Sequence, residues 1–323
     1  MKILIIRLSS LGDLILTQSV CAFLREQYPD AEIHYIAKAA YLEIIPLMGL
    51  AIQPISYSKS LKAHIELFKQ RYDLVLDLHN KLSSRLISSA AWAKKSAVYN
   101  KQRKTRKQII AGNKELSISS TVNLYKSALS PFFKVDTLAA PELQIPYGAP
   151  GIQLPTGRKL IMVFPGAQHF TKMYPLEYYK ELIQKSPADY YYILAGSSAE
   201  HPLCEKLRAS APDTTFNIAG KYSFAELLQI MQPMDLVISS DSGPMHLAAA
   251  IQKEQIAIFG ATHPRLGFAP LNPKAKILTQ DLDCQPCSLH GSERCPLGHF
   301  KCMKELKPAL LLKTIEASFK NNS

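Results

Sequence analysis

Short apolar runs alternate with helical patterns along the whole chain, and this alternation is the feature that most restricts the fold. Apolar runs typical of buried strands occur at 3–6, 33–37, 52–55, 74–78, 160–164, 191–195, 236–239 and 256–259. Helical patterns separate or follow them at 14–28, 65–71, 83–93, 175–185 and 200–209. Such alternation implies parallel sheets covered by helices on both faces. We therefore predict an α/β protein with doubly wound parallel sheets.

A segment dense in proline and glycine interrupts the alternation between residues 141 and 157. Its breakers are Pro141, Pro146, Gly148, Pro150, Gly151, Pro155 and Gly157. The full length of 323 residues suits two domains of roughly 150 residues each. We predict domains at 1–150 and 151–323 that face a common cleft, because ligands bind at the carboxyl ends of the strands in such sheets. A last helical pattern at 308–319 is expected to pack back over the first domain.

The chain is basic, with 38 Lys and Arg against 26 Asp and Glu and a net charge of +12. A field of this sign attracts polyanions, namely nucleic acid, an anionic membrane or a phosphorylated substrate. The sequence contains no run of eighteen apolar residues, so we predict no membrane-spanning helix. The apolar start is interrupted by Arg7 and Asp13 and lacks a small-residue cleavage site, so we interpret it as a strand and a helix. We expect a cytoplasmic protein.

A polar turn follows the predicted strand at 236–239. Asp241 and Ser242 can hydrogen-bond a sugar or a phosphate, and Gly243 allows the backbone to approach a ligand closely. Pro244 opens a helix, and His246 lies one turn into it. The free N–H groups at that helix start favour an anion site. A capped helix with a buried histidine is the alternative.

The first predicted strand ends in a second polar turn, which contains Ser10, Gly12 and Asp13. A glycine turn in this position can cradle a phosphate, although a single glycine is a weak signal. Asp13 is a candidate general base for an acceptor hydroxyl. Capping of the helix that follows is the simpler role for the same carboxylate.

Three further residues follow strands of the second half. Gly166 ends one strand, and Lys172 follows it in a position to neutralise a leaving diphosphate. Glu200 follows the next strand, where an acidic residue can hold ribose hydroxyls. A solvated lysine and an ordinary acid in the first turn of a helix are the alternatives.

The segment 101–107 carries five basic side chains, among them Arg103, Lys104 and Arg106. We interpret it as a loop that binds phosphates of a lipid, a nucleic acid or a glycan. It has no interleaved aromatic residues for base stacking, so we expect no nucleic-acid partner. A solvated, mobile loop is the alternative.

Four of the six cysteines, Cys284, Cys287, Cys295 and Cys302, lie within nineteen positions. The first pair has the spacing of zinc ligands, and four thiols can close a tetrahedral structural site. Free thiols are the alternative, and no partnered base marks a catalytic thiol. A disulfide framework is not expected in the cytoplasm.

Taken together, these motifs resemble the bacterial lipopolysaccharide heptosyltransferases of glycosyltransferase family 9. The resemblance covers essentially the whole chain, from the turn at Ser10–Asp13 to the cysteine segment, which is most similar to the heptosyltransferase II branch. It implies a GT-B fold of two Rossmann-like domains, an ADP-heptose donor and an inverting transfer that needs no catalytic metal. The acceptor implied is the heptosyl-Kdo-lipid A type of inner core, at the cytoplasmic face of the inner membrane.

The resemblance also implies roles for individual residues. Asp13 matches the proposed general base and Lys172 the lysine that holds the donor diphosphate. The donor-binding residues that we expect are Ser10, Gly12, Gly166, Glu200, Tyr222, Asp241, Ser242, Gly243, Pro244 and His246. The acceptor-binding residues that we expect are Lys81, Arg85, Arg103, Lys104 and Arg106. Met173 and Tyr174 depart from the basic residue and Trp of many relatives, which bears on the preferred sugar.

Two other classes of function remain open at this point. One is a GT-B transferase with another nucleotide sugar or glycan acceptor. The other is a nonenzymatic polyanion-binding protein, which would have no use for the turn from Asp241 to His246. We expect a monomeric enzyme in which the first domain binds the acceptor and the second binds the nucleotide sugar.

Overall fold

The computed structural model describes residues 1–148 and 151–320. The chain divides into two compact units. The first comprises residues 1–103 and 119–144, and the second comprises residues 104–118 together with the described residues from 145 onward. Pro150, where we expected the first domain to end, lies outside the described residues. The contacts therefore divide the chain near residue 144 and assign the segment 104–118 to the second unit, which the sequence did not predict.

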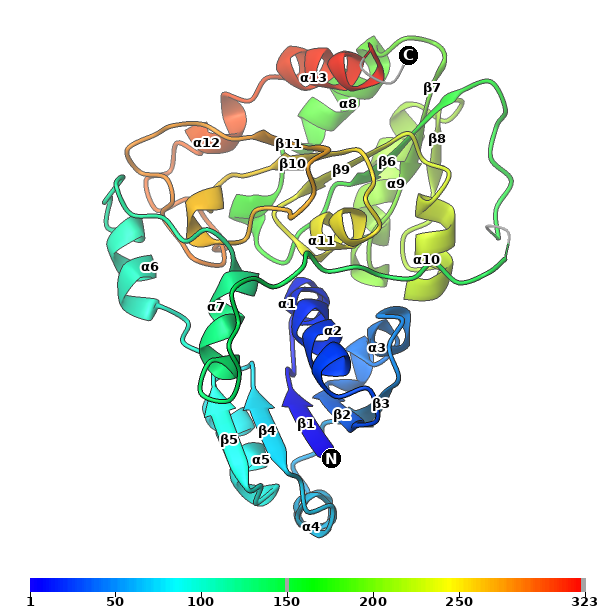
Figure 1. Ribbon diagram of the computed structural model, residues 1–323. Coiled ribbons are helices and arrows are strands. Elements are labelled where there is room, and N and C mark those ends of the chain that lie inside the picture. The colour runs from blue at the N-terminus through cyan, green and yellow to red at the C-terminus, as the bar shows by residue number, and fades with distance from the viewer. Residues whose placement is uncertain (149–150, 321–323) are drawn as a thin grey trace. The chain divides into compact units, whose positions relative to one another are not determined.

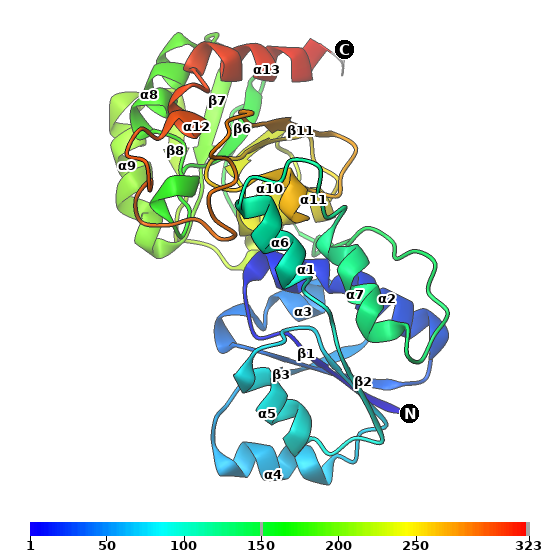
Figure 2. The same ribbon diagram turned by 90° about the vertical axis from the view of Figure 1, so that its left-hand side faces the viewer.

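The first unit contains a sheet of five parallel strands in the order β3-β2-β1-β4-β5. The strands are β1 (Lys2–Ile6), β2 (Glu32–Ala37), β3 (Ile52–Ser56), β4 (Leu74–Asp77) and β5 (Lys95–Val98). The helices are α1 (Leu11–Leu16), α2 (Gln18–Gln27), α3 (Ile44–Leu47), α4 (Leu61–Lys69), α5 (Leu82–Ala90) and α7 (Thr121–Leu129). Helices cover both faces of this sheet, with α4 and α5 together on one of them (Figures 1 and 2).

The second unit contains six parallel strands in the order β11-β10-β9-β6-β7-β8. They are β6 (Lys159–Phe164), β7 (Tyr190–Leu194), β8 (Thr215–Asn217), β9 (Leu236–Ser240), β10 (Gln255–Ile258) and β11 (Ala275–Leu278). The helices are α6 (Arg103–Ile110), α8 (Leu176–Lys185), α9 (His201–Ser210), α10 (Phe224–Met231), α11 (Gly243–Ala250), α12 (Lys301–Lys304) and α13 (Pro308–Lys320).

Both sheets are doubly wound, and in each the second and third strands lie on one side of the first and the later strands on the other. The predicted fold class is therefore confirmed. Residues at alternate positions of β1 face opposite sides of its sheet, and Leu4 and Ile6 pack with Leu67 of α4 and Ile87 of α5. In the second unit, side chains of β6 and β7 pack with α8, α9 and α13.

The last helix, α13, was expected over the first domain. Its buried side chains Leu311, Ile315 and Phe319 instead belong to the core of the second unit, where α13 packs against α8. The physical reason is that α8 leaves apolar surface such as Tyr179 and Leu182 that needs a cover.

Several elements differ from the sequence prediction. The helix expected at 14–28 begins at Leu11 and is divided into α1 and α2 around Thr17. The basic segment 101–107 is largely helical, because α6 begins at Arg103, and is not the loop that we predicted. Strands β5, β8 and β11 were not predicted, and each forms or lies near an edge where fewer residues are buried.

Side-chain caps fix the starts of several helices. The Ser60 hydroxyl accepts from the backbone N–H of Ala63 at the start of α4, at 3.2 Å. At the start of α10, Ser223 and Glu226 bond to each other's backbone N–H groups in a capping box. No helix in the described part of the chain has the length and apolarity needed to cross a membrane.

Candidate functional site

Each sheet has one position where the strand order reverses, and several of the predicted site residues lie in the loops at these two positions. In the first unit the reversal lies between β1 and β4, and in the second between β6 and β9. Loops that leave such a pair of strands turn in opposite directions and open a crevice at the carboxyl ends of the strands. The turn with Asp13 follows β1, and the turn with Asp241 follows β9. Each unit thus contains some of the predicted residues, and the second unit contains the larger share.

Asp13 lies in the first turn of α1, and one of its oxygens makes all of its side-chain contacts. Oδ2 lies 2.5 Å from the Arg7 guanidinium and accepts hydrogen bonds from the Ser10 backbone N–H at 3.2 Å and the Ser10 hydroxyl at 2.9 Å. Oδ1 makes no hydrogen bond within the described residues. The side chain is 19% exposed. One oxygen therefore caps and anchors the turn, while the other is available to a ligand.

The protonation of Asp13 is set by opposing effects. Burial by itself raises the pKa of the carboxyl, but the Arg7 charge and the hydrogen bonds from Ser10 outweigh it and lower the pKa to about 2. Asp13 is consequently ionised at neutral pH and ready to accept a proton.

Arg7 connects the loops on the two sides of the first reversal point. Its guanidinium donates to the carbonyl of Ser9, after β1, at 2.9 Å and to the carbonyl of Leu78, after β4, at 2.5 Å. It also donates to the Tyr99 hydroxyl at 3.3 Å. From the sequence, we expected of Arg7 only that it excludes a signal peptide. The available signal was a cation directly after four buried apolar residues.

Two further titratable groups lie near Asp13, namely His79, which no signal in the sequence marked, and Lys101, the first residue of the basic segment. Burial and the charges of Arg7, Lys101 and Lys81 lower the pKa of His79 to about 3, so this histidine is neutral. Burial and the Arg7 charge lower the pKa of Lys101 to about 8. The surroundings of Asp13 are thus strongly positive, which favours an anionic ligand.

The buried Asp77 at the end of β4 shapes the loop that carries the predicted acceptor residues. Its carboxylate accepts from the backbone N–H groups of His79 and Asn80 and from the Ser84 hydroxyl, at 2.8 to 2.9 Å. This loop leads into α5 and places Lys81 and Arg85 on its exposed side.

The residues of the basic segment have different environments. Arg103 is exposed and donates to the Asn80 carbonyl at 2.9 Å, and Lys104 is exposed. Arg106 is buried in the second unit, where it donates to the Leu266 carbonyl at 3.3 Å and stacks 4.7 Å from the Phe268 ring centre. The buried position of Arg106 does not suit the acceptor contact that we expected of it.

At the reversal point of the second unit, Lys172 and Asp241 form an ion pair. Their Nζ and Oδ2 atoms are 2.9 Å apart, with the side chains 15% and 7% exposed. Asp241 therefore holds the ammonium in place and can accept from a ligand with its second oxygen. An ammonium has three donors, so Lys172 retains donors for an anion.

The turn before Lys172 is fixed by the cysteine segment. Thr171 exchanges hydrogen bonds with Ser292, donating from its backbone N–H at 3.1 Å and accepting at its hydroxyl at 2.8 Å. The Thr171 carbonyl accepts from the Ala261 N–H at 3.1 Å. No sequence signal marked Thr171 or Ser292 as supports of this lysine.

The turn after Asp241 leads directly into α11, as predicted. Ser242 occupies the N-cap position, and Gly243 and Pro244 begin the helix. Behind them, the hydroxyls of Ser239 and Ser240 are buried and have no hydrogen-bond partner among the described residues. His246 is 5% exposed, consistent with a packed histidine in the first turns of the helix.

Glu200 lies between the loops that follow β6 and β7. One of its oxygens accepts from the backbone N–H and the hydroxyl of Ser197 at 2.7 and 2.8 Å. The other lies against the Cα of Gly166, where a Cβ atom would collide with it. The structure thus brings Gly166 and Glu200 together, while Tyr222 is half-buried in the turn after β8.

The four clustered cysteines and His299 line a small cavity of about 20 Å³. All of the cysteines are free, and Cys284 Sγ lies 3.9 Å from His299 Nε2. Within the described residues, no group of three or more His, Cys, Asp or Glu side chains is arranged to hold a metal ion. A structural zinc at these cysteines is therefore an expectation from spacing alone.

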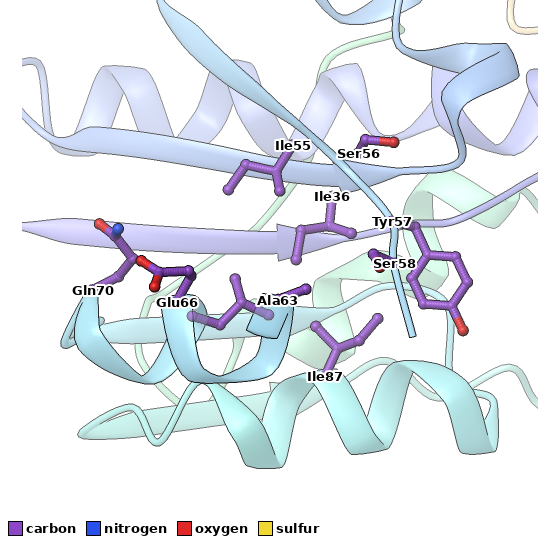
Figure 3. A pocket seen from close by; sticks show the side chains of 10 residues that line it. Ile36, Ile55, Ser56, Tyr57, Ser58, Ala63, Glu66, Gln70 and Ile87 are labelled. Atoms are coloured by element: carbon purple, nitrogen blue, oxygen red, sulfur yellow. The ribbon is translucent and has the colours of Figure 1, made fainter. Parts of the chain in front are cut away.

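A larger cavity of about 250 Å³ lies in the first unit beneath α4 (Figure 3). Its lining is mostly apolar and includes Ile36, Ile55, Leu67 and Ile87. None of the predicted site residues contributes to it.

Comparison with known proteins identifies the family. The sequence model of glycosyltransferase family 9 (heptosyltransferase) matches residues 61–297, which is most of the chain. The chain belongs to glycosyltransferase family 9.

Relatives of this family 9 transferase include enzymes of both numbered heptosyltransferase types. Lipooligosaccharide heptosyltransferase 2 of Campylobacter jejuni is 27% identical over 100% of this chain and 99% of its own. Lipopolysaccharide heptosyltransferase 1 of Campylobacter coli is 29% identical over 81% of this chain and 84% of its own.

Among solved structures, the Escherichia coli ADP-heptose lipopolysaccharide heptosyltransferase II has the same fold as the family 9 transferase. The TM-score is 0.79 at 23% identity, and each chain is covered in full. The expected GT-B fold is thus confirmed.

Proposed function

We propose that this family 9 transferase moves a heptose from ADP-heptose to the inner core of lipopolysaccharide, on a heptosyl-Kdo-lipid A type acceptor. The names of the relatives supply the donor and the class of acceptor. The observation that carries the proposal is the Asp13 carboxylate, ionised and fixed through one oxygen, with the other free for an acceptor hydroxyl. The cysteine segment and the type 2 relatives support the heptosyltransferase II branch.

In this proposal the second unit holds the donor. Lys172 and the backbone N–H groups at the start of α11 bind the diphosphate, since both are positive and lie at the reversal point of the sheet. Asp241 positions Lys172, and Gly166 leaves room for Glu200 at the strand ends. Glu200 receives the ribose hydroxyls through the oxygen that does not cap its own turn, with Tyr222 on the adenine side.

The first unit holds the acceptor in this proposal. Lys81, Arg85 and Arg103 lie on or beside the loop that follows β4 and meet the acidic sugars and phosphates of the core. Lys101 and Arg7 add positive charge close to Asp13. We omit Arg106 from this group because it is buried against Phe268.

The proposed step is a single displacement with inversion. The acceptor oxygen forms a bond to heptose C1 as the bond from C1 to the diphosphate oxygen breaks, and the bonding electrons leave with ADP. Asp13 Oδ1 takes the proton of the acceptor hydroxyl. A carboxylate of low pKa is a weak base, so this proton moves late, after positive charge has developed at C1. Lys172 and the helix N–H groups stabilise the departing charge and take the part that a divalent ion has in other transferases.

The acceptor is lipid-anchored, so the proposed place of action is the cytoplasmic face of the inner membrane, with the enzyme as a peripheral monomer. Structural zinc at the four cysteines is a separate proposal with one support, the spacing of the first pair. Metal analysis of purified protein, with and without Cys284→Ser and Cys287→Ser, tests it.

Mass spectrometry of the product tests the function. Purified enzyme is incubated with ADP-heptose, ADP-glucose or UDP-glucose and a panel of truncated cores. We expect one heptose to be added from ADP-heptose to the heptosyl-Kdo core. Transfer from another nucleotide sugar alone would favour a different GT-B transferase. Binding of single-stranded RNA without binding of ADP would favour the nonenzymatic alternative.

The residue assignment has its own test. Asp13→Asn should lower turnover by about a hundredfold to ten-thousandfold, the range of general base catalysis, while ADP binds normally. Normal turnover of this variant with the natural acceptor would contradict the assignment.

A further inference from the structure

Large apolar side chains are exposed in one short segment of the first unit. Six of them lie between residues 61 and 92, a larger number than in any other segment of this length in the described chain. They are Leu61, Ile65, Phe68, Leu82, Leu86 and Trp92, and we call them the α4–α5 apolar surface. All six lie on α4, on α5 or in the turn that ends α5, and these two helices pack against each other (Figure 3).

Most of the large apolar side chains of α4 face away from the core. Leu61, Ile65 and Phe68 are spaced at i, i+4 and i+7 and therefore share one face of the helix. That face is exposed, whereas Leu67 is the single buried residue of α4. The cavity of about 250 Å³ beneath α4 shows that the inner face of the helix does not fill the space against the sheet (Figure 3). Packing within this unit therefore does not explain why the outer face of α4 is apolar.

Helix α5 and the turn after it carry the other three exposed apolar side chains. Leu82 and Leu86 are one turn apart and exposed. Trp92 follows the helix and is 78% exposed, and it is the single tryptophan of the chain. A solvent-exposed tryptophan beside leucines is typical of surfaces that enter the interfacial region of a bilayer.

The charges around these side chains are predominantly positive. Residues 57–95 contain eight Lys and Arg against three Asp and Glu. Each of the acids is already engaged, because Glu66 pairs with Lys69 at 3.0 Å, Asp73 pairs with Lys94 at 2.7 Å, and Asp77 is buried. The exposed cations that have no acidic partner among the described residues are Lys59, Lys62, Arg71, Lys81, Arg85 and Lys95.

We propose that the α4–α5 apolar surface docks on an anionic lipid bilayer. Apolar side chains would enter the boundary between headgroups and acyl chains, while the lysines beside them reach the lipid phosphates with their ammonium groups. Negative headgroups complement the net positive charge of the segment. A protein partner would need acidic groups in the same arrangement, and a second copy of this chain would bring its own positive charges to the contact.

The inference extends the proposed function, because a lipid-anchored acceptor is reached most directly by an enzyme that is itself on the bilayer. The evidence for it nevertheless comes only from the α4–α5 apolar surface, so membrane docking can be tested without measuring glycosyl transfer.

Trp92 provides a probe within the surface itself. We would titrate the full chain with vesicles of phosphatidylethanolamine and phosphatidylglycerol and, separately, with vesicles of phosphatidylcholine. Binding to the anionic vesicles should move the tryptophan emission to shorter wavelength and make it sensitive to lipids with brominated acyl chains. High salt should weaken the binding. Failure to bind the anionic vesicles, or binding with unchanged emission, would overturn the proposal.

A matched pair of variants distinguishes docking through this surface from nonspecific binding of vesicles by any exposed apolar residue. Leu61→Ser, Ile65→Ser and Phe68→Ser are combined in one variant, and Phe216→Ser and Leu310→Ser, exposed apolar side chains of the second unit, form the control. The first variant should lose at least about tenfold in vesicle affinity, since each apolar side chain contributes to burial in the bilayer. The control should bind like the parent. Equal loss in both variants, or no loss in the first, would contradict the assignment.

Two further measurements distinguish the alternatives. Analytical ultracentrifugation of the parent and the triple variant tests self-association, and a dimer abolished by the triple substitution with no change in vesicle binding would replace the bilayer by a subunit interface. Heptosyl transfer to a deacylated, water-soluble acceptor should be the same in the parent and the triple variant, while transfer to vesicle-bound acceptor falls. If the parent transfers no heptose but binds vesicles through Trp92, the proposed function fails and the docking surface stands.

Discussion

Asp13 divides two tasks between its two oxygens. Oδ2 serves the structure, because it accepts from Ser10 at the start of α1 and contacts Arg7. Oδ1 has no such duty in the described residues. The alternatives that the sequence offered, a helix cap or a base, are therefore compatible. Lys172 presents a similar case, since its ion pair with Asp241 holds it in place for a ligand.

The acid limit of activity should respond to Arg7. The pKa of Asp13 is lowered from 3.8 to about 2, so its ionised form persists down to acid pH. Arg7→Gln removes the charge that opposes the effect of burial, and the pKa should rise. We expect the acid limb of the pH–rate profile to move to higher pH, whereas the exposed-residue control Arg71→Gln leaves it in place. An unchanged acid limb in Arg7→Gln would exclude Asp13 as the base.

The same shift predicts how stability depends on pH. A carboxyl with a lowered pKa in the folded state stabilises that state above its unfolded pKa, near 3.8, and this contribution is lost as the pH falls toward 2. The free energy of unfolding of the parent should therefore decrease over this range more than that of Asp13→Asn. Denaturant titrations at several pH values measure the difference, and parallel curves would contradict it.

Replacement of Lys172 should weaken binding of the nucleotide-sugar donor. Lys172→Met alone leaves the nearly buried Asp241 without its cation and should destabilise the fold as well. The double variant Lys172→Met with Asp241→Asn avoids that unpaired charge. We expect it to bind ADP about tenfold to a hundredfold more weakly by calorimetry, since charge-assisted hydrogen bonds are lost. Parent-like affinity would remove Lys172 from the diphosphate site.

At the scale of elements, the loops after β1, β4, β6 and β9 carry most of the residues of the proposed site. The sequence predicted those four strands to within about a residue of their ends. Buried parallel strands are continuous apolar runs, so the sequence predicts their ends at the positions where polar residues begin. Strands β5, β8 and β11 are short and partly exposed, which removes that signal. The segment with α6 was misread because its charges concealed a helix that buries Arg106 and Ile109.

A side chain at Gly166 in the loop after β6 would require Glu200 to move. A Cβ atom there would lie 2.7 Å from Glu200 Cγ, closer than such atoms approach. Gly166→Ala should lower both thermal stability and ADP affinity, because Glu200 must move. Gly166→Ala combined with Glu200→Ala removes the collision, so the two effects should not be additive. Additive losses in the double-mutant cycle would show that the contact is not the cause.

At the scale of the whole molecule, the chain folds into two units, and each of them combines segments that are separated in the sequence. The second unit includes residues 104–118, which Arg265 fixes by donating to the Lys114 carbonyl at 3.0 Å. Lys114 also pairs with Asp283 at 2.9 Å. The second unit likewise includes α13, whose apolar face completes the cover of α8.

Loss of the α13 contact should therefore destabilise the second unit, which we propose binds the donor. Ile315 is fully buried, and Ile315→Ala should cost about 2–5 kcal/mol. In calorimetry, the unfolding transition that ADP raises should fall in temperature. Leu310→Ala, on the exposed side of the same helix, should change it little. If Ile315→Ala left the ADP-sensitive transition unchanged, α13 would not belong to the donor unit.

The sequence by itself determined the class of fold, the positions of the central strands along the chain and the turns that carry Asp13, Gly166 and Asp241. These features depend on neighbouring residues, through periodicity, turn chemistry and helix starts, and can be read locally. The tertiary structure decided that Arg7 anchors Asp13, that Asp241 holds Lys172, that Arg106 is buried, and that α13 packs on α8. All but the first join residues far apart in the chain, and in every case only the packing of the sheets and helices brings their atoms within hydrogen-bonding or van der Waals distance.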